Sequence, residues 1–268
     1  MPIIIKSDDE IEIMHQSGRI VAEVLELLAT EIRPGLIVRK LDTIVRENYR
    51  RRNVTPTFLG YQGYPAHICV SVNDEIVHGI PGERALQEGD IVSIDLGATH
   101  RGFVADSALT IGVGRIGPEE QQLINVTYQS LWEGIRAARP GARLGEVSHA
   151  IQTYAESHGY GVVREYVGHG VGREMHEEPQ VPNYGPSDRG PILRKGMVLA
   201  LEPMVNVGSF ETKEHDDGWT VSTLDGSLSA HFEHTIAILD GGPEILTLRS
   251  DEEPATAEPA TAMAQRAR

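Results

Sequence analysis

Asp95 and Asp106 stand eleven positions apart within the glycine-bounded stretch 89–114. Two runs rich in apolar and β-branched residues flank a short polar segment in this stretch, which is the pattern of a β-hairpin. If the turn centres on residues 100–101, the two aspartates lie directly opposite each other across the ladder. Opposed carboxylates repel each other, and either a shared proton or a bound cation would relieve the repulsion. The stretch therefore predicts a metal site, and a solvated strand face is the alternative.

A third carboxylate occupies the matching place in a similar strand later in the chain. Residues 196–202 begin with glycine and reach a carboxylate, Glu202, six positions on, as residues 89–95 do 107 positions earlier. A Pro-Gly pair separates two expected helices before each of these strands, at 34–35 and again at 140–141. Two matches at nearly the same offset indicate a duplicated α/β half.

The duplication predicts where the carboxylates lie. The two halves would span about residues 8–114 and 115–248. If they pack about a pseudo-twofold axis, the strands that carry Asp95 and Glu202 point towards a common centre. The carboxylates of the two halves would then converge on one site.

A fourth carboxylate comes from the strand expected at 228–239. Period-2 alternation places Glu233 and His231 on one face of this strand and His234 on the other. Four acidic side chains form an oxygen-rich cage of the kind that prefers hard or borderline divalent ions. Glycines on both sides of His169 keep its imidazole accessible, which makes it the best candidate for a nitrogen ligand.

The composition fits a globular α/β protein and limits its partners. The 268 residues can bury a sizeable core, and 40% of them are hydrophobic. A formal charge of −15 disfavours a nucleic-acid backbone or an anionic membrane as the main partner, whereas it suits a site that collects cations. The single cysteine, Cys69, excludes an internal disulfide and fits a reducing compartment. No signal peptide is recognisable and no apolar run reaches the ~18 residues of a membrane span, so we expect a cytoplasmic protein.

The other elements follow from helix caps, breakers and periodicity. Ser7 and Glu10 form a capping box at the start of a helix expected over residues 8–30. Further helices are expected up to Arg52, from Pro118 to just before Pro140, and from Leu144 to Gly159, with strands at 68–72 and after the turn at 73–74. From Asp251 onward the chain repeats Pro-Ala-Thr-Ala, which predicts a disordered tail over 251–268.

Five motifs follow one another along the chain. They are His78 within 73–81, Asp95 with Asp106, Gly168-His169-Gly170 with His176 seven positions on, Leu201-Glu202-Pro203, and Glu233-His234-Thr235. Together these motifs closely resemble those of the methionine aminopeptidases, and the resemblance extends from Ser7 to Arg249. Only 26 residues separate His176 from Glu202, which leaves no room for the helical insertion of type II enzymes, and the chain starts at the catalytic domain. The resemblance is therefore to type I enzymes in their short bacterial form.

The resemblance implies a fold and a metal centre. The fold is the pita-bread α/β fold, in which two pseudo-twofold-related halves combine antiparallel β-sheet with flanking helices, here as one catalytic domain over residues 1–250. The cofactor is a pair of divalent metal ions, Fe(II), Mn(II), Co(II) or Zn(II). Asp95 and Glu233 would bridge the two ions, Asp106 would complete one site, and His169 with Glu202 would complete the other. Such ions lower the pKa of a bridging water and polarise the scissile carbonyl, and Glu202 would take the proton from that water.

The resemblance also assigns residues outside the metal shell. His176 would hydrogen-bond the carbonyl oxygen as it becomes an oxyanion, and His78 would contact the scissile amide nitrogen. An apolar pocket of aromatic rings with a soft sulfur neighbour suits a thioether side chain. The residues that match the family's methionine pocket are Phe58, Tyr61, Tyr64, Cys69, Met175 and Trp219. Familiar bacterial members carry Cys in place of Phe58, Phe in place of Met175 and Gln in place of His231, so the shape of the pocket is the feature in which this chain departs.

The activity implied is removal of the initiator methionine from nascent proteins and peptides whose second residue is small and uncharged. The expected partner is a nascent polypeptide N-terminus, at the ribosome or free, and we expect a monomer with no nucleic-acid specificity and no membrane association. A proline-directed peptidase of the same fold, an aminopeptidase P or prolidase, would share the five ligands but usually carries a long N-terminal domain. A metal-free binding protein on this scaffold is the other alternative, and it is disfavoured because such relatives have lost ligands that this chain retains.

Overall fold

The structure, a computed structural model, describes residues 2–253 of the chain. Four α-helices lie within these residues, at α1 (Asp8–Glu31), α2 (Arg39–Arg52), α3 (Pro118–Ala137) and α4 (Leu144–Ser157), together with a short 3₁₀ turn, η1 (Tyr61–Gly63). All four helices lie where the caps and breakers predict them. None of the helices in residues 2–253 is long and apolar enough to cross a bilayer.

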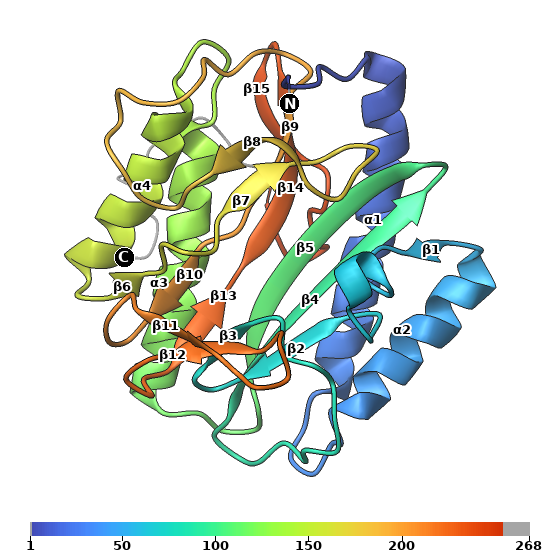
Figure 1. The fold of residues 1–268 in the computed structure, drawn as a ribbon, viewed down its shortest axis with the longest axis vertical. Helices are drawn as coiled ribbons and strands as arrows, with labels where there is room; N and C mark the ends of the chain where they lie inside the picture. The colour runs from blue at the N-terminus through green and yellow to red at the C-terminus, as the bar shows by residue number, and fades with distance from the viewer. Residues whose placement is uncertain (1, 254–268) are drawn as a thin grey trace, which may run out of the picture.

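The central element is a curved, nine-stranded sheet (Figure 1). Its strands are β1 (Thr55–Pro56), β2 (Cys69–Val72), β4 (Ile91–His100), β5 (Phe103–Gly112), β7 (Gly168–Gly170), β8 (Glu177–Val181), β9 (Val198–Leu201), β14 (Glu233–Leu239) and β15 (Gly242–Ile245). The order is β1-β4-β5-β14-β9-β7-β8, with β2 also paired to β4 and β15 to β14, and every pairing is antiparallel. The β4-β5 hairpin of the first half therefore lies beside the β14-β9 pair of the second half.

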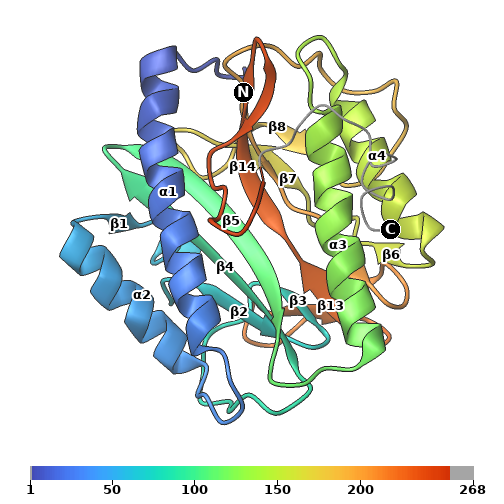
Figure 2. The ribbon, with the colours of Figure 1, turned by 180° about the vertical axis from the view of Figure 1, so that it is seen from behind.

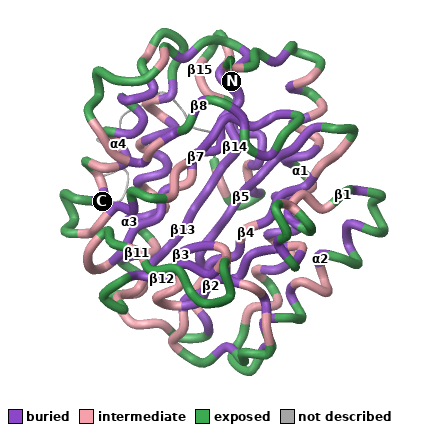
Figure 3. The backbone as a smooth tube through the Cα atoms, in the orientation of Figure 1, coloured by how far each residue is buried: buried purple, intermediate pink, exposed green. Residues whose placement is uncertain are grey.

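Two small sheets complete the β structure of the described residues. One has the order β13 (Ser229–His231), β10 (Met204–Asn206), β6 (Gly161–Val162), and the other the order β11 (Thr212–Glu214), β12 (Val221–Thr223), β3 (Glu75–Val77). Seen from behind, α1 and α3 lie across one face of the large sheet, with α2 outside α1 and α4 beside α3 (Figure 2). The candidate functional site lies on the opposite face of the sheet, which these helices do not cover. Figure 3 shows the central strands as continuous buried tube, while the exposed residues gather on the helices and loops at the periphery.

Helix α1 begins and packs as its sequence predicts. The Ser7 hydroxyl accepts a hydrogen bond from the Glu10 backbone N–H at 3.3 Å, and the Glu10 carboxylate accepts one from the Ser7 N–H at 3.0 Å, so the capping box is confirmed. A side chain at Gly18 would place its Cβ 2.1 Å from the carbonyl oxygen of Leu246, which explains a glycine in the middle of this helix. The apolar face predicted for the helix is buried, at Ile11, Met14, Val21, Leu25 and Leu28.

The register predicted for the β4-β5 hairpin is wrong by two residues. His100 pairs with Phe103, so the turn consists of Arg101 and Gly102, which have φ values of 51° and 82°. Two-residue hairpin turns with positive φ at both positions favour glycine at the second position, and this preference places the turn one residue later than we expected. Asp106 consequently pairs with Gly97, and not with Asp95. Because the error is an even number of residues, both aspartates still lie on the same face as diagonal neighbours.

The single strand predicted at 228–239 is also corrected. The chain leaves the small sheet after His231 and enters the large sheet at Glu233, so β13 and β14 belong to different sheets. Between them, the Phe232 backbone N–H donates to the Pro203 carbonyl at 3.3 Å, and the Phe232 ring packs against Tyr128 with centroids 5.4 Å apart. A packed aromatic side chain at the break lets the strand change sheets.

The predicted tail over 251–268 lies outside the described residues from 254 onward. Residues 251–253 are described, and Glu252 is buried with only 3% of its side chain exposed. Its carboxylate lies 3.2 Å from Nε2 of His234 and also bonds Arg249. The packed chain therefore continues past the expected boundary at 251.

Candidate metal centre and active site

One pocket, of about 170 Å³, collects the residues singled out from the sequence. It is lined by Asp95, Asp106, His169, Glu202 and Glu233, by His78 and His176, and by Phe58, Tyr61, Tyr64, Cys69, Met175 and Trp219. All five predicted ligands, both predicted histidines and all six predicted methionine-pocket residues thus share one cavity. Gln62 also lines it and was not anticipated.

The five candidate ligands lie on or directly after neighbouring strands of the large sheet. Asp95 lies on β4, Asp106 on β5, Glu233 at the start of β14, Glu202 directly after β9, and His169 in the middle of β7. These five strands are consecutive neighbours in the sheet, and each supplies one ligand. Sequence segments up to 138 positions apart therefore meet because their strands pair.

The geometry fits a cation. Asp106, His169 and Glu233 each offer a ligand atom within 4.8 Å of the others, and all three are buried. Nε2 of His169 lies 3.5 Å from a carboxylate oxygen of Glu202. One oxygen each of Asp95, Asp106 and Glu233 is buried with no hydrogen-bond partner. Buried polar atoms are normally satisfied, and a divalent ion accepting these oxygens as ligands would satisfy all three.

Burial and mutual repulsion make the carboxylates costly to ionise without a cation. Burial, reinforced by the neighbouring carboxylate charges, raises the pKa values of Asp95, Glu202 and Glu233 well above their usual range. Burial also raises the pKa of Asp106, to about 7. A bound divalent ion would favour the charged forms and reverse these shifts.

His169 is held in the protonation state that a metal ligand requires. Burial lowers its pKa to about 3, so the imidazole is neutral at neutral pH. Its Nδ1 lies 2.9 Å from the carbonyl oxygen of Gly170. A carbonyl can only accept, so Nδ1 carries the ring proton and Nε2, which faces Glu202, presents a lone pair.

Side-chain hydrogen bonds to the backbone hold together the strands that carry the acidic residues. The Thr235 hydroxyl lies 2.9 Å from the backbone nitrogen of Asp106 and 2.8 Å from its carbonyl oxygen. The Ser107 hydroxyl donates to the carbonyl of Glu233 at 2.6 Å, and the Asn183 amide donates to the carbonyl of Glu202 at 3.0 Å. These contacts were missed from the sequence, where the only signal was that Ser107 and Thr235 lie one and two positions beyond a candidate ligand.

The two candidate catalytic histidines reach the pocket from different loops. His78 follows β3 with a φ of 60°, and its ring packs edge-on against Tyr166 and Trp219. Burial lowers the pKa of His78 to about 4 and also lowers the pKa of His176. His176 lies against His169, with ring centroids 4.3 Å apart, and its Nδ1 is 2.6 Å from the Tyr61 hydroxyl. Both rings are therefore neutral at neutral pH.

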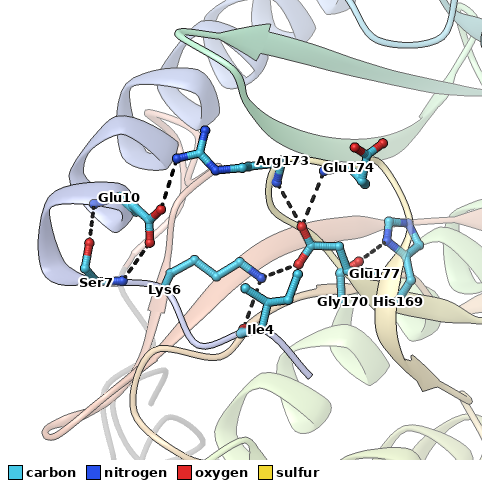
Figure 4. A network of polar contacts seen from close by, with 9 residues as sticks. All are labelled: Ile4, Lys6, Ser7, Glu10, His169, Gly170, Arg173, Glu174 and Glu177. Carbon is cyan, nitrogen blue, oxygen red and sulfur yellow. Dashed lines mark hydrogen bonds and ion pairs between the residues drawn. The ribbon is translucent and has the colours of Figure 1, made fainter. Parts of the chain in front are cut away.

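A buried ion pair holds the loop from Gly170 to Glu177, which carries Met175 and His176 (Figure 4). Lys6 Nζ lies 2.6 Å from Oε2 of Glu177, with 3% and 4% of the two side chains exposed. The other oxygen of Glu177 accepts the backbone N–H groups of Arg173 at 2.9 Å and of Glu174 at 3.3 Å. No sequence pattern predicts this pair, because Lys6 precedes the first helix and lies 171 positions from its partner.

The apolar part of the pocket is built from edge-on aromatic rings. Tyr64 packs against Phe58 at 6.5 Å and against Trp219 at 5.0 Å between centroids. Its hydroxyl lies 3.0 Å from two backbone carbonyls, so the ring is fixed and its apolar surface is left for the pocket. Phe58 and Met175, two of the three departures from the familiar pattern, line the cavity directly. The third, His231, is 1% exposed and is not among the residues that line the pocket, and its Nε2 has no hydrogen-bond partner.

Comparison with known proteins places this site in a family. The profile of Metallopeptidase family M24 matches residues 12–240, and the chain belongs to that family. It is 53% identical over 247 residues to the methionine aminopeptidase of Clostridium acetobutylicum, covering 92% of this chain and 99% of that protein. Its structure matches the crystal structure of the methionine aminopeptidase of Thermotoga maritima with a TM-score of 0.90 at 48% identity, covering 92% of this chain and 99% of the other. Within family M24, the chain is therefore a member of the methionine aminopeptidases.

A more distant match concerns the fold alone. Prolidase from Pyrococcus furiosus superimposes with a TM-score of 0.76 at 24% identity, covering 92% of this chain and 66% of that one. The pita-bread fold that methionine aminopeptidases and prolidases share is thus the fold of this protein, as the resemblance implied. The much higher identity to the methionine aminopeptidases disfavours the proline-directed alternative.

Proposed function

We propose that this protein removes the N-terminal methionine from nascent proteins and peptides whose second residue is small and uncharged. The observation that carries the proposal is the convergence of five candidate ligands, from five consecutive strands, beside an apolar pocket lined by aromatic rings and sulfur. An enzyme of this kind needs a metal-activated nucleophile next to a slot that recognises a thioether, and both parts lie in one cavity here.

The proposed cofactor is a pair of divalent ions, Fe(II), Mn(II), Co(II) or Zn(II), held by Asp95, Asp106, His169, Glu202 and Glu233. When bound, such ions lower the pKa of a bridging water to near neutrality and polarise the scissile carbonyl. The three unpartnered carboxylate oxygens and the lone pair of His169 support this assignment.

The residues around the ions have proposed roles in the reaction. Glu202 takes the proton of the attacking water, which its partial exposure to the pocket permits. His176 donates a hydrogen bond to the carbonyl oxygen as negative charge develops on it. His78 contacts the scissile amide nitrogen. The methionine side chain occupies the apolar part of the pocket, between Tyr64, Trp219 and Met175.

We further propose that residues 1–250 act as a single catalytic domain of two related halves, in a cytoplasmic monomer. Its partner is the N-terminus of a nascent chain, free or at the ribosome. The formal charge of −15 supports binding of a positively charged peptide N-terminus by electrostatic attraction, and it disfavours direct nucleic-acid binding.

The test is an activity profile of the purified protein. A series of Met-X peptides should be cleaved when X is Gly, Ala or Ser and resisted when X is large or charged, with each of the four metals supplied at controlled concentration. Comparison of Met-Gly-Met-Met with Gly-Pro separates this function from a proline-directed one. Cleavage of Gly-Pro alone, or no metal uptake by the protein, would overturn the proposal.

A further inference from the structure

Tyr61 makes a contact that recognition of methionine does not require. Its hydroxyl lies 2.6 Å from Nδ1 of His176, and the two rings are tilted at 45° with centroids 5.3 Å apart. An apolar pocket uses only the face of the tyrosine ring, and a phenylalanine would supply the same face. Recognition of methionine therefore does not explain the hydrogen bond between the Tyr61 hydroxyl and His176.

One residue beside Tyr61 has a backbone conformation that costs free energy. Gln62 has a φ of 48°, and it lies between Gly60 and Gly63, whose φ values of 83° and 93° are accessible to glycine without strain. The chain nevertheless closes tightly here, with hydrogen bonds from Gly60 N to Tyr64 O at 2.8 Å and from Tyr64 N to Tyr61 O at 2.9 Å. A non-glycine residue at positive φ persists where the surrounding structure holds it, and such positions cluster at functional sites. The turn fixes Tyr61 at the edge of the pocket, beside His176.

The chemistry of the two groups favours one direction for this hydrogen bond. Either atom can donate, depending on the tautomer of His176, but a phenol is the better donor and an imidazole nitrogen the better acceptor, which favours donation from the Tyr61 O–H to Nδ1 of a neutral His176. A neutral imidazole carries one ring proton, and with Nδ1 accepting, that proton must lie on Nε2.

The neighbouring histidine shows the opposite arrangement. Nδ1 of His169 meets a carbonyl, which can only accept, so His169 keeps its proton on Nδ1 and offers a lone pair at Nε2. Nδ1 of His176 meets a hydroxyl, which can donate. With the Tyr61 hydroxyl as donor, these two imidazoles, whose centroids lie 4.3 Å apart, are opposite tautomers. A metal ligand needs the first tautomer and an oxyanion donor needs the second.

We propose that Tyr61 is a positioning residue for His176, whose hydroxyl donates to Nδ1 and keeps the ring proton on Nε2 for donation to the substrate carbonyl oxygen as it becomes negative. The inference rests on the proposed function, because it assigns the atom through which His176 performs its proposed role. Under this proposal Tyr61 has a second role besides lining the methionine pocket.

The first test reads the tautomer directly. In long-range ¹H–¹⁵N spectra of the zinc-loaded protein, whose metal is diamagnetic, His176 should show a protonated Nε2 and an unprotonated Nδ1. In the Tyr61→Phe variant the other tautomer should become populated. A protonated Nδ1 on His176 in the unmodified protein, or an unchanged spectrum in the variant, would overturn the inference.

The second test separates tautomer control from a structural role. Tyr61→Phe should lower kcat by about ten- to a hundredfold, the cost found when a metal-ligating histidine loses the partner that orients it, with little change in KM because the ring face remains. In a His176→Gln background the same substitution should change kcat by less than about twofold, since an amide has no ring tautomer to fix. Equal losses in the two backgrounds would contradict the proposal.

Tyr154→Phe is the matched control. Tyr154 also lies beside a histidine, His158, with ring centroids 4.6 Å apart, but on α4 and away from the pocket. This variant should leave kcat, KM and the His176 signals unchanged. If the unmodified, metal-loaded protein fails to cleave Met-Ala-Ser, the proposed function fails, whereas the spectra still decide the state of His176.

Discussion

The acidic residues of the metal centre differ in how the chain supports them. Asp106 and Glu233 are 2% exposed, and each of them, like Asp95, leaves one buried oxygen without a partner, so these three ligands need a cation when they are charged. Glu202 keeps 15% of its side chain exposed and lies 3.5 Å from Nε2 of His169. An acid that must both bind an ion and exchange a proton with water needs this partial access to the pocket. Burial therefore separates the acids by task, although all of them are carboxylates.

Glu202→Gln should abolish turnover while most of the metal stays bound. Glutamine keeps an oxygen for coordination and the size of the side chain, but it cannot accept the proton of the attacking water, so kcat should fall by about a hundred- to ten-thousandfold. Initial rates on Met-Gly-Met-Met, together with the metal content of the same preparations, provide the measurement. Glu12→Gln, on the exposed side of α1, is the control and should keep full activity. Equal activity in the Glu202 variant would sink its role as the proton acceptor.

At the scale of the element, local signals in the sequence located the helices and strands, and tertiary contacts decided the rest. The capping box and Pro118 fix helix starts because the groups they satisfy lie within one turn of the chain. The β4-β5 register was missed by two residues because it depends on where the positive-φ turn falls, at Arg101 and Gly102. The hairpin, the internal repeat and the glycines around His169 pointed to the five candidate ligands, whereas the two pocket histidines and the methionine-pocket residues came from the family resemblance, since the pairing of distant strands leaves no local mark.

The Lys6–Glu177 pair is the clearest example of a contact that sequence reasoning could not reach. It joins the segment before α1 to the loop that carries Met175 and His176, and its charges are buried on both sides. Neither residue belongs to a periodic pattern. The backbone N–H of Lys6 also donates to Gly196 O at 2.7 Å, so the N-terminal segment is held against the strand that leads to Glu202.

Lys6→Met should destabilise the protein and loosen the loop from Gly170 to Glu177. Removing one partner of a buried ion pair leaves an uncompensated charge, which typically costs about 3–5 kcal/mol of unfolding free energy, and KM for Met-X peptides should rise because Met175 lines the pocket. Denaturant unfolding and steady-state kinetics measure the two effects. Adding Glu177→Gln should recover most of the loss, since the amide oxygen can still accept the Arg173 and Glu174 N–H groups.

The control for this pair is Lys195→Met. Lys195 lies between Asp8 and Asp240 at the surface, at 3.5 Å and 3.0 Å, where solvent screens the charges. We expect little change in stability or KM. A loss as large as that of Lys6→Met would show that burial of the ion pair is not what matters.

At the scale of the whole molecule, the folded protein brings negatively charged groups close together, which costs free energy. The chain has a formal charge of −15, and four carboxylates converge in one cavity. A bound cation neutralises the carboxylates directly. Without a cation, some of these carboxylates must be protonated in the folded protein. The unfolded chain has no such requirement, because its carboxylates are separate and solvated. Folding and metal binding are therefore linked through protons.

This linkage predicts how the stability of the metal-free protein depends on pH. Between about pH 4 and 6.5 two sets of groups oppose each other. The carboxylates, with pKa values raised to about 7 for Asp106 and well above the usual range for Asp95, Glu202 and Glu233, hold protons mainly in the folded state. The buried histidines, with pKa values lowered to about 4 for His78 and about 3 for His169 and His231, bind protons only in the unfolded state.

Above about pH 6.5 the histidines of the unfolded chain lose their protons, so their opposing contribution fades and the carboxylates dominate. The folded state then holds more protons than the unfolded state, so the free energy of unfolding must fall as pH rises. We expect the Tm of chelator-treated protein to decrease from pH 6.5 to pH 8.5, and saturating divalent metal to remove this decrease because the ion keeps the carboxylates charged. Scanning calorimetry across this range provides the measurement, with Asp106→Asn as the variant whose metal-free decline should be smaller. A metal-free Tm that stays level or rises over the same range would mean that the carboxylates of the folded protein are already ionised, and that the cage does not need a cation to hold its charge.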